Sequence, residues 1–217
     1  MKKNYLSQNF LIFSFFLVVC IACNLSTSNI KRGEILLVDD FSESDRGWEI
    51  WSKDGESAVS KVGDKLTMIL QIPHTDIITT NHITYPNIEM TVDVAKDHGS
   101  TDNLIGFVCR HQNDKNYYGF LISSDGFYGI IKMKQGKSQL LYADNLQYSE
   151  VINQANEPNH LIAICDKEKL SFFVNSEELI SVTDRDLTFG GNGLLIGSFE
   201  EPNDLVVSFD NFLLRAR

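Results

Sequence analysis

The stretch IGFVCRHQNDKNYYGFLISSDGFYGIIK, residues 105–132, consists of short apolar runs separated by polar residues. Within and around it the runs 104–111, 117–123 and 127–133 have the length and the spacing of strands. Ser124-Asp125-Gly126 separates the last two runs, and a Gly-containing turn of this kind is typical of a β-hairpin. This part of the chain therefore predicts consecutive antiparallel strands.

The same pattern continues outward in both directions, and no stretch combines helical periodicity with convincing caps. The other candidate strands are 34–38, 46–51, 57–60, 65–72, 77–83, 87–95, 138–142, 160–165, 169–175, 178–183, 193–199 and 205–215. Two further turns are expected at 166–168 and 175–177, a loop at 190–193, and a long loop or short helical turn at 143–159.

Alternation along two of these runs indicates which side chains face the interior. Leu66, Met68, Leu70 and Ile72 share one face of their strand, and Ile88, Met90, Val92 and Val94 share one face of theirs. Many short strands without intervening helices predict an all-β fold, a single domain spanning 34–217. About 184 residues exceed an immunoglobulin sandwich of roughly 100, so we expect a two-sheet antiparallel jelly-roll sandwich.

The composition is that of a globular protein. The 217 residues are 43% hydrophobic and carry 19 Lys+Arg against 29 Asp+Glu, a formal charge of −10. Such a chain is neither mostly disordered nor a multi-span membrane protein. The acidic balance also argues against a nucleic-acid partner, because phosphate contacts need clustered cations.

Residues 1–22 have the pattern of an export signal. Lys2 and Lys3 precede an apolar run, 10–22, that is too short to span a bilayer comfortably. Small Ala22 before Cys23 resembles a bacterial lipobox, with Cys23 as the lipidated residue and 23–33 as a polar tether, although Cys20 stands where such motifs usually carry Leu. An uncleaved anchor, or a signal cut elsewhere, is the alternative. We expect an exported lipoprotein on the extracytoplasmic face of a membrane.

Four phrases in order resemble a known family. They are VDDFSESDRGW at 38–48, the 105–132 stretch, NHLIAICDKEKLSFFVNSEEL at 159–179 and GLLIGSFEEPNDLVVSFDNFLL at 193–214. Together they resemble bacterial extracytoplasmic domains of the concanavalin A-like lectin/glucanase fold, similar to laminin G-like modules and to the 3-keto-disaccharide hydrolase domain. The resemblance implies that the two ends of the domain lie close together. It does not imply an activity, because this fold hosts lectins, glycosidases and interaction modules.

Cys109 and Cys165 lie in two different predicted strands. An exported chain meets an oxidising compartment, so this pair is a candidate disulfide. Two buried free thiols that behave as small hydrophobic side chains are the alternative. Cα atoms more than roughly 7 Å apart would exclude the bond.

Nothing in the sequence has the pattern of a catalytic motif. Glucanases of this fold carry acids at alternate positions of one strand, whereas here Glu89 and Asp93 are separated by roughly 13 Å of strand, too far for either glycosidase geometry. The five histidines lack zinc-ligand spacing. A site assembled from distant strands remains open, so the enzyme question is undecided and leans to no.

Binding to a sugar would need exposed aromatic faces and a few polar groups. The candidates are Trp48, Trp51, Arg110, Tyr117, Tyr118 and Tyr128. Arg110, one of the two tyrosines and Tyr128 could form a patch across neighbouring strands. The alternative is that the aromatic residues are core and that Arg110 pairs with a buried acid such as Asp93.

Calcium is the one cofactor considered, because jelly rolls of this kind often carry one near the chain termini. Asp39, Asp40, Asp210 and Asn211 could supply some of the 6–8 oxygens needed. The expected function is a lipid-anchored β-sandwich module that binds a glycan or an envelope or protein partner. A glycoside-cleaving enzyme of the same fold and a purely structural lipoprotein are the alternatives.

Overall fold

The computed structural model describes residues 30–43, 46–53, 55–199 and 204–217, and these form strands and connecting segments without a helix. The strands are β1 (Ile35–Asp39), β2 (Trp51–Lys53), β3 (Ser57–Lys61), β4 (Leu66–Leu70), β5 (Thr75–Thr80), β6 (Ile88–His98), β7 (Asn103–Asn113), β8 (Asn116–Ile122), β9 (Phe127–Lys134), β10 (Lys137–Leu140), β11 (Gln147–Tyr148), β12 (Asn159–Asp166), β13 (Lys169–Val174), β14 (Glu177–Thr183), β15 (Gly191–Ser198) and β16 (Leu205–Ala216). The predicted signal 1–22 and Cys23 lie outside the described residues. Within the described ranges no helix is long and apolar enough to cross a membrane.

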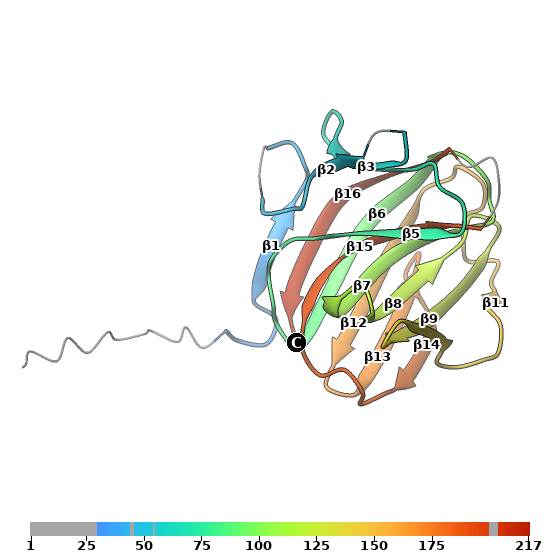
Figure 1. The fold of residues 1–217 in the computed structure, drawn as a ribbon. Coiled ribbons are helices and arrows are strands. Elements are labelled where there is room, and N and C mark those ends of the chain that lie inside the picture. The colour runs from blue at the N-terminus through green and yellow to red at the C-terminus, as the bar shows by residue number, and fades with distance from the viewer. Residues whose placement is uncertain (1–29, 44–45, 54, 200–203) are drawn as a thin grey trace, which may run out of the picture.

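Two antiparallel sheets pack face to face, as predicted (Figure 1). The nine-stranded sheet has the order β14-β13-β12-β6-β16-β4-β3-β2, and β1 pairs with β16 at its side. The seven-stranded sheet has the order β10-β9-β8-β7-β15-β5, and β11 pairs with β9. Sequential hairpins interrupted by long crossovers, such as β15 between β7 and β5, make this a jelly-roll sandwich.

The main core lies between the sheets. Alternating residues of β6 and β4 point into it, and the predicted inward faces are confirmed for Met68, Met90 and Val92, none of which is exposed. Large aromatic side chains fill the centre, with Phe120 of the seven-stranded sheet against Phe172 of the nine-stranded sheet at a centroid distance of 5.9 Å. Burial of this continuous apolar layer is the main force that holds the sheets together.

The disulfide predicted from the export signal is present. Cys109 on β7 and Cys165 on β12 are bonded, with their Cα atoms 6.9 Å apart. Because β7 belongs to one sheet and β12 to the other, the bond links the two layers of the sandwich covalently.

The two ends of the domain meet, as the resemblance implied. β1 runs antiparallel to β16, with Asp39 opposite Phe212. Asp39 is buried and its carboxylate accepts a hydrogen bond from Trp48 Nε1 at 2.9 Å and another from the Phe41 backbone N–H at 2.8 Å. Trp48 packs edge-on against Phe212. Asp39 and Trp48 therefore fasten the first strand to the last.

Several predicted boundaries differ from the structure. The hairpin turns at 124–126, 166–168 and 175–177 are confirmed, and Asn175 and Ser176 have the positive φ that a tight turn requires. The predicted strand 46–51 is wrong, because only Trp51–Lys53 form a short strand there. The segment 143–159 contains the two-residue strand β11. Most of the predicted loop 190–193 already belongs to β15, because Gly191 pairs with His111 of β7 and Gly193 pairs with Val108.

Candidate functional site

A second apolar cluster lies on the face of the seven-stranded sheet that points away from the main core. Its buried members are Leu104, Val108, Tyr117, Leu121, Ile131 and Leu195, with Ile78, Met133, Leu140 and Leu146 packed against them. Side chains alternate along a strand, so Tyr118 and Phe120 face the main core while their neighbours Tyr117 and Leu121 face outward. The outer face of a two-layer antiparallel sandwich is usually polar, and an apolar outer face marks an interaction site.

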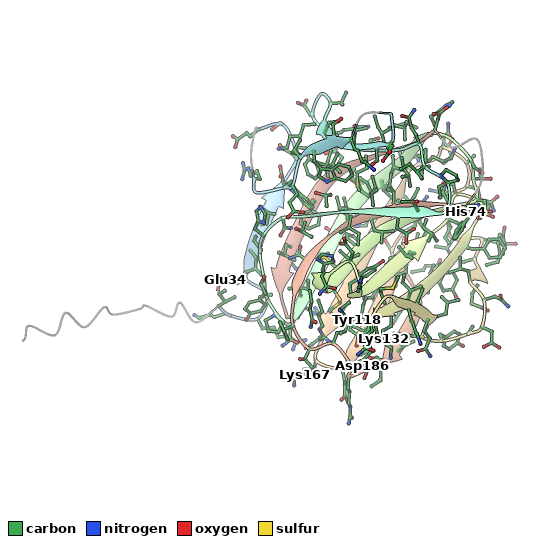
Figure 2. The ribbon with its side chains drawn as sticks, viewed as in Figure 1. Glu34, His74, Tyr118, Lys132, Lys167 and Asp186 are labelled. Carbon is green, nitrogen blue, oxygen red and sulfur yellow. A yellow bond between two sulfur atoms is a disulfide. The ribbon has the colours of Figure 1, made fainter. Side chains whose placement is uncertain are left out.

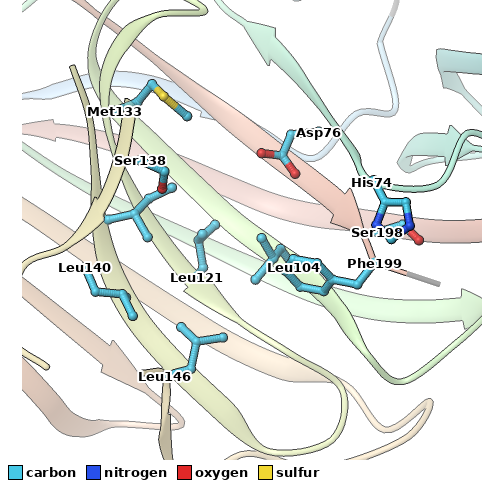
Figure 3. A pocket seen from close by; sticks show the side chains of 11 residues that line it. His74, Asp76, Leu104, Leu121, Met133, Ser138, Leu140, Leu146, Ser198 and Phe199 are labelled. Carbon is cyan, nitrogen blue, oxygen red and sulfur yellow. The ribbon is translucent and has the colours of Figure 1, made fainter. Parts of the chain in front are cut away.

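This outer face is hollowed in two adjoining places. Figure 3 shows the side chains that line the first, which we call the aliphatic hollow. Its volume is about 390 Å³. It is lined by His74, Asp76, Leu104, Leu121, Ile131, Met133, Ser138, Leu140, Leu146, Ser198 and Phe199. Its walls come from β5, β7, β8, β9, β10 and β15, so the sheet itself forms the floor. The Ser198 hydroxyl is buried there without a hydrogen-bond partner among the described residues.

The second, which we call the acidic hollow, has a volume of about 560 Å³. It is lined by Glu49, Trp51, Asp76, Ile77, Ile78, Asp114, Tyr117 and Met133. The two hollows share Asp76 and Met133 as lining residues, so they adjoin, and we call the two together the cleft. The cleft thus has an aliphatic end and an end with carboxylates and two aromatic rings, a composition suited to a small ligand.

Asp76 occupies the junction of the two hollows. It lies opposite Gly197 in the pairing of β5 with β15, and a Cβ atom added to Gly197 would come 2.1 Å from Asp76 Oδ1. The missing side chain at Gly197 therefore makes room for the carboxylate. The surrounding protein removes part of its hydration and so raises the pKa of the Asp76 carboxyl, although the residue keeps an exposed surface.

Tyr117 supplies the phenol of the acidic hollow. The residue is only 2% exposed, and its hydroxyl forms no hydrogen bond with a described residue. Burial raises the pKa of this phenol, and the negative charges of Asp76 and Asp114 raise it further. The hydroxyl therefore keeps its proton at neutral pH and has a hydrogen bond to donate to a ligand.

The structure brings together two of the six predicted ligand-binding residues. Trp51 and Tyr117 both line the acidic hollow. Trp48 is instead buried against Phe41 and Phe212, and Tyr128 packs against the main core and donates a hydrogen bond to the Leu179 carbonyl at 3.2 Å. In this structure these two belong to the interior rather than to an exposed patch.

Arg110 and Tyr118 are also interior residues. Arg110 is 2% exposed, and its guanidinium donates to the backbone carbonyls of Leu187, at 2.7 Å, and of Lys167. The guanidinium also lies over the Tyr118 ring. Burial lowers the pKa of Arg110, and nearby acids partly offset this. The prediction that Arg110 pairs with a buried acid such as Asp93 is wrong, because backbone carbonyls accept the hydrogen bonds of its guanidinium.

The Tyr118 hydroxyl belongs to an ion-pair cluster at the edge of the sandwich. It donates to Asp184 Oδ1 at 2.5 Å, and Lys132 binds both Asp184, at 2.6 Å, and Asp186, at 2.8 Å. Tyr118, Lys132 and Asp186 lie at the same end of the molecule (Figure 2). Burial, and then the hydrogen bond to Asp184, raise the pKa of Tyr118 to about 12. Every charged group here has a partner, so we interpret the cluster as structural.

The calcium candidates are dispersed over separate interactions. Asp39 holds Trp48, the Asp40 carboxylate accepts from Ser42, and Asn211 donates to Asp93 Oδ2 at 2.9 Å. Asp93 also binds His160 Nδ1, at 2.6 Å. Among the residues that the structure describes, no three His, Cys, Asp or Glu side chains are grouped as a metal site would require.

Reasoning from the sequence missed most of the cleft, although a signal was present. The strands β7, β8 and β15 contain the apolar runs LIGFVC, YYGFLI and GLLIG, which do not alternate with polar residues. A run that is apolar at every position indicates that both faces of the strand are apolar, so that each is either covered by the protein or available for binding. In an outer layer this pattern marks the binding face.

No protein-family model and no curated protein matches the sequence of this chain. Its structure is similar to the carbohydrate-binding module CBM66 from Bacillus subtilis, with a TM-score of 0.60 and 15% identity over 78% of this chain and 96% of that one. It is also similar to a Bacillus subtilis protein of unknown function with a galectin-like fold, with a TM-score of 0.61 and 15% identity over 86% and 97%.

A third similar structure is the GH43 protein BlXynB from Bacillus licheniformis. The TM-score is 0.64 and the identity 14%, over 83% of this chain but only 39% of that one. These likenesses show the fold. The jelly-roll architecture predicted from the sequence is therefore confirmed by both the sheet topology and the neighbours.

Proposed function

We propose that this protein is a glycan-binding module and that the cleft on the seven-stranded sheet holds the glycan. The observation that carries the proposal is the apolar outer face, hollowed into a cleft in which Trp51 and Tyr117 stand beside carboxylates. Sugars present apolar C–H faces that stack on aromatic rings and hydroxyls that bond to acids and phenols. Structural neighbours that include a carbohydrate-binding module support the proposal.

A glycan array probed with the full-length chain tests this function. We expect selective binding that is lost in Trp51→Ala, which removes a half-buried ring, and in Ser138→Trp, which fills the aliphatic hollow from an exposed position. Glu178→Trp places the same large side chain on β14, outside the cleft, and should bind as the parent does. Equal binding by all variants would place the site elsewhere, and no binding by the parent would contradict the proposal.

Glycoside cleavage is the second candidate, favoured by one observation. The acidic hollow contains three carboxylates, and its surroundings raise the pKa of one of them, Asp76, as they do for the general acid of a glycosidase. The glycans retained on the array are therefore incubated with the protein and analysed for shorter products. Products that disappear in Asp76→Asn would favour the enzyme over the binding module.

We further propose that the module is held at the extracytoplasmic face of a membrane by a lipid on Cys23. The apolar run before Cys23 and the polar segment after it support this proposal. Metabolic labelling with an alkyne fatty acid should mark the parent chain and not Cys23→Ser, and only the parent should sediment with membranes. Labelling that persists in Cys23→Ser would contradict lipidation at this residue.

A further inference from the structure

The cleft is electrostatically one-sided. Its described lining residues include Glu49, Asp76 and Asp114 but no Lys or Arg. Asp114 has the His111 ring within 3.5 Å, whereas Asp76 and Glu49 form no ion pair with a described residue. The carboxylate at the junction of the two hollows is therefore available to a ligand, and the whole chain, at −10, adds a long-range attraction for cations.

Two hydroxyls along the cleft also lack hydrogen-bond partners among the described residues. The Tyr117 hydroxyl, on a residue that is 2% exposed, lines the acidic hollow without a hydrogen bond to a described residue. Ser198 Oγ lines the aliphatic hollow, and this atom is itself buried without a partner. A buried polar group left unpaired costs free energy, so the Ser198 position favours a ligand that pairs with it, and the Tyr117 hydroxyl has a hydrogen bond to offer the same ligand.

The chemistry of these groups restricts the ligand. Carboxylates only accept hydrogen bonds, so the acidic hollow favours a partner rich in donors and repels an anion. A protonated amine offers three donors and a positive charge, and it can also lie against the Trp51 ring. A hydroxyl offers one donor and no charge. A carboxylated or sulfated sugar would bring a second negative charge beside Asp76.

We propose that the cleft selects glycans in which the sugar residue at the acidic hollow carries a free, protonated amine, over the same glycan with a hydroxyl or a carboxylate. This inference rests on the proposed glycan-binding function and names its ligand class. Asp76 is the residue that discriminates, because it is the unpaired carboxylate shared by both hollows. The aliphatic hollow then accommodates the apolar face of the neighbouring sugar.

Three β-1,4-linked tetrasaccharides with the same backbone test the selection. The glucosamine tetramer carries an amine at C2 of each sugar, and cellotetraose carries a hydroxyl there. The glucuronic acid tetramer is cellotetraose with a carboxylate at C6 of each sugar. Each is titrated at neutral pH and low salt into the full-length chain held in phosphatidylcholine nanodiscs. We expect the amine to bind at least about tenfold more tightly than the hydroxyl, a difference that shrinks as salt screens the charge. We expect no measurable binding of the carboxylate.

Matched variants assign the effect to its residue. Asp76→Asn preserves shape and should reduce the preference for the amine to about twofold or less. Asp97 is an exposed acid on β6, and Asp97→Asn should leave the preference for the amine ligand unchanged. Tyr117→Phe should weaken the binding of the glucosamine tetramer and of cellotetraose to a similar degree, because it removes a hydrogen-bond donor rather than a charge.

The outcomes separate this inference from the proposed function. Equal or tighter binding of cellotetraose, or any preference for the glucuronic acid tetramer, overturns the selection for an amine and leaves glycan binding in place. A preference that survives in Asp76→Asn overturns the role of this carboxylate. Binding to none of the three also overturns the inference, and the glycan array then decides by itself whether the proposed function fails.

Discussion

At the scale of single residues, the cleft depends on side chains that the fold leaves without partners. Asp76 is accommodated by the missing side chain at Gly197, and Tyr117 is buried near enough to Asp76 and Asp114 for their charges to raise the pKa of its phenol. Two other buried polar residues have their partners, Arg110 in backbone carbonyls and Asp39 in Trp48 and Phe41. The unpaired groups of the cleft are available to a ligand, which supports the proposed binding function.

Asp76→Asn should stabilise the unliganded protein at neutral pH. Partial desolvation raises the pKa of this carboxyl in the folded state, so the charged form is penalised by folding above that pKa. Below the unfolded pKa the group is protonated in both states and the penalty vanishes. The gain in unfolding free energy should therefore be largest near neutral pH and fade on acidification. Urea denaturation across this pH range measures it, and a gain that grows toward acid would contradict the assignment.

Asp39→Ala should destabilise the junction of the chain ends. It leaves Trp48 Nε1 and the Phe41 N–H buried without their acceptor, which costs about 2 kcal/mol in unfolding free energy. Asp40→Ala, at the neighbouring exposed position, is the matched control and should change stability little. If urea titrations gave the same loss of unfolding free energy for Asp39→Ala and Asp40→Ala, Asp39 would not stabilise the contact between β1 and the rest of the domain.

At the scale of elements, close approach of strands constrains the sheet that carries the cleft. Gly193 of β15 lies so near β5 that an added Cβ would meet the Thr79 carbonyl at 2.0 Å. Gly191, two positions earlier, has its nearest atom, the His111 carbonyl oxygen, at 3.6 Å from such a Cβ. The same substitution on the same strand should therefore have two different costs.

Gly193→Ala should lower the unfolding free energy by roughly 3 kcal/mol, because backbone cannot move aside as a flexible side chain can. Gly191→Ala should change it by less than about 1 kcal/mol. Chemical denaturation of both variants supplies the comparison. A small cost at Gly193 would mean that β5 shifts freely relative to β15, and glycan binding in the cleft would then have to be remeasured.

At the scale of the whole molecule, the Cys109–Cys165 bond joins the two sheets covalently. The two residues are 56 positions apart, so the bond closes a long loop in the unfolded chain. Cross-linking a loop of this size removes enough conformational entropy to stabilise the fold by about 4 kcal/mol. The bond also fixes β7, which contributes to the floor of the cleft, against β12.

Replacing both cysteines by serine should lower the unfolding free energy by about that amount and lower the melting temperature. Reducing agent should destabilise the parent to a similar degree and leave the double variant unchanged, which is the internal control. If the disulfide of the parent is reduced only slowly, the parent should have the stability of the double variant once reduction is complete. A parent whose stability is the same before and after complete reduction would contradict a stabilising cross-link.

The sequence alone determined the all-β class, most strand positions and the hairpin turns, because turn chemistry and side-chain alternation act between neighbours in the chain. It named Cys109 and Cys165 as a candidate pair, and the structure decided that they are bonded. Only the tertiary structure decided which of two apolar faces becomes the interior. Tyr117 and Tyr118 are adjacent and chemically identical, yet one lines the cleft and the other the core. The cleft joins residues from Glu49 to Phe199. Such a site depends on how distant strands pair and which face the second sheet covers, and no local pattern encodes either.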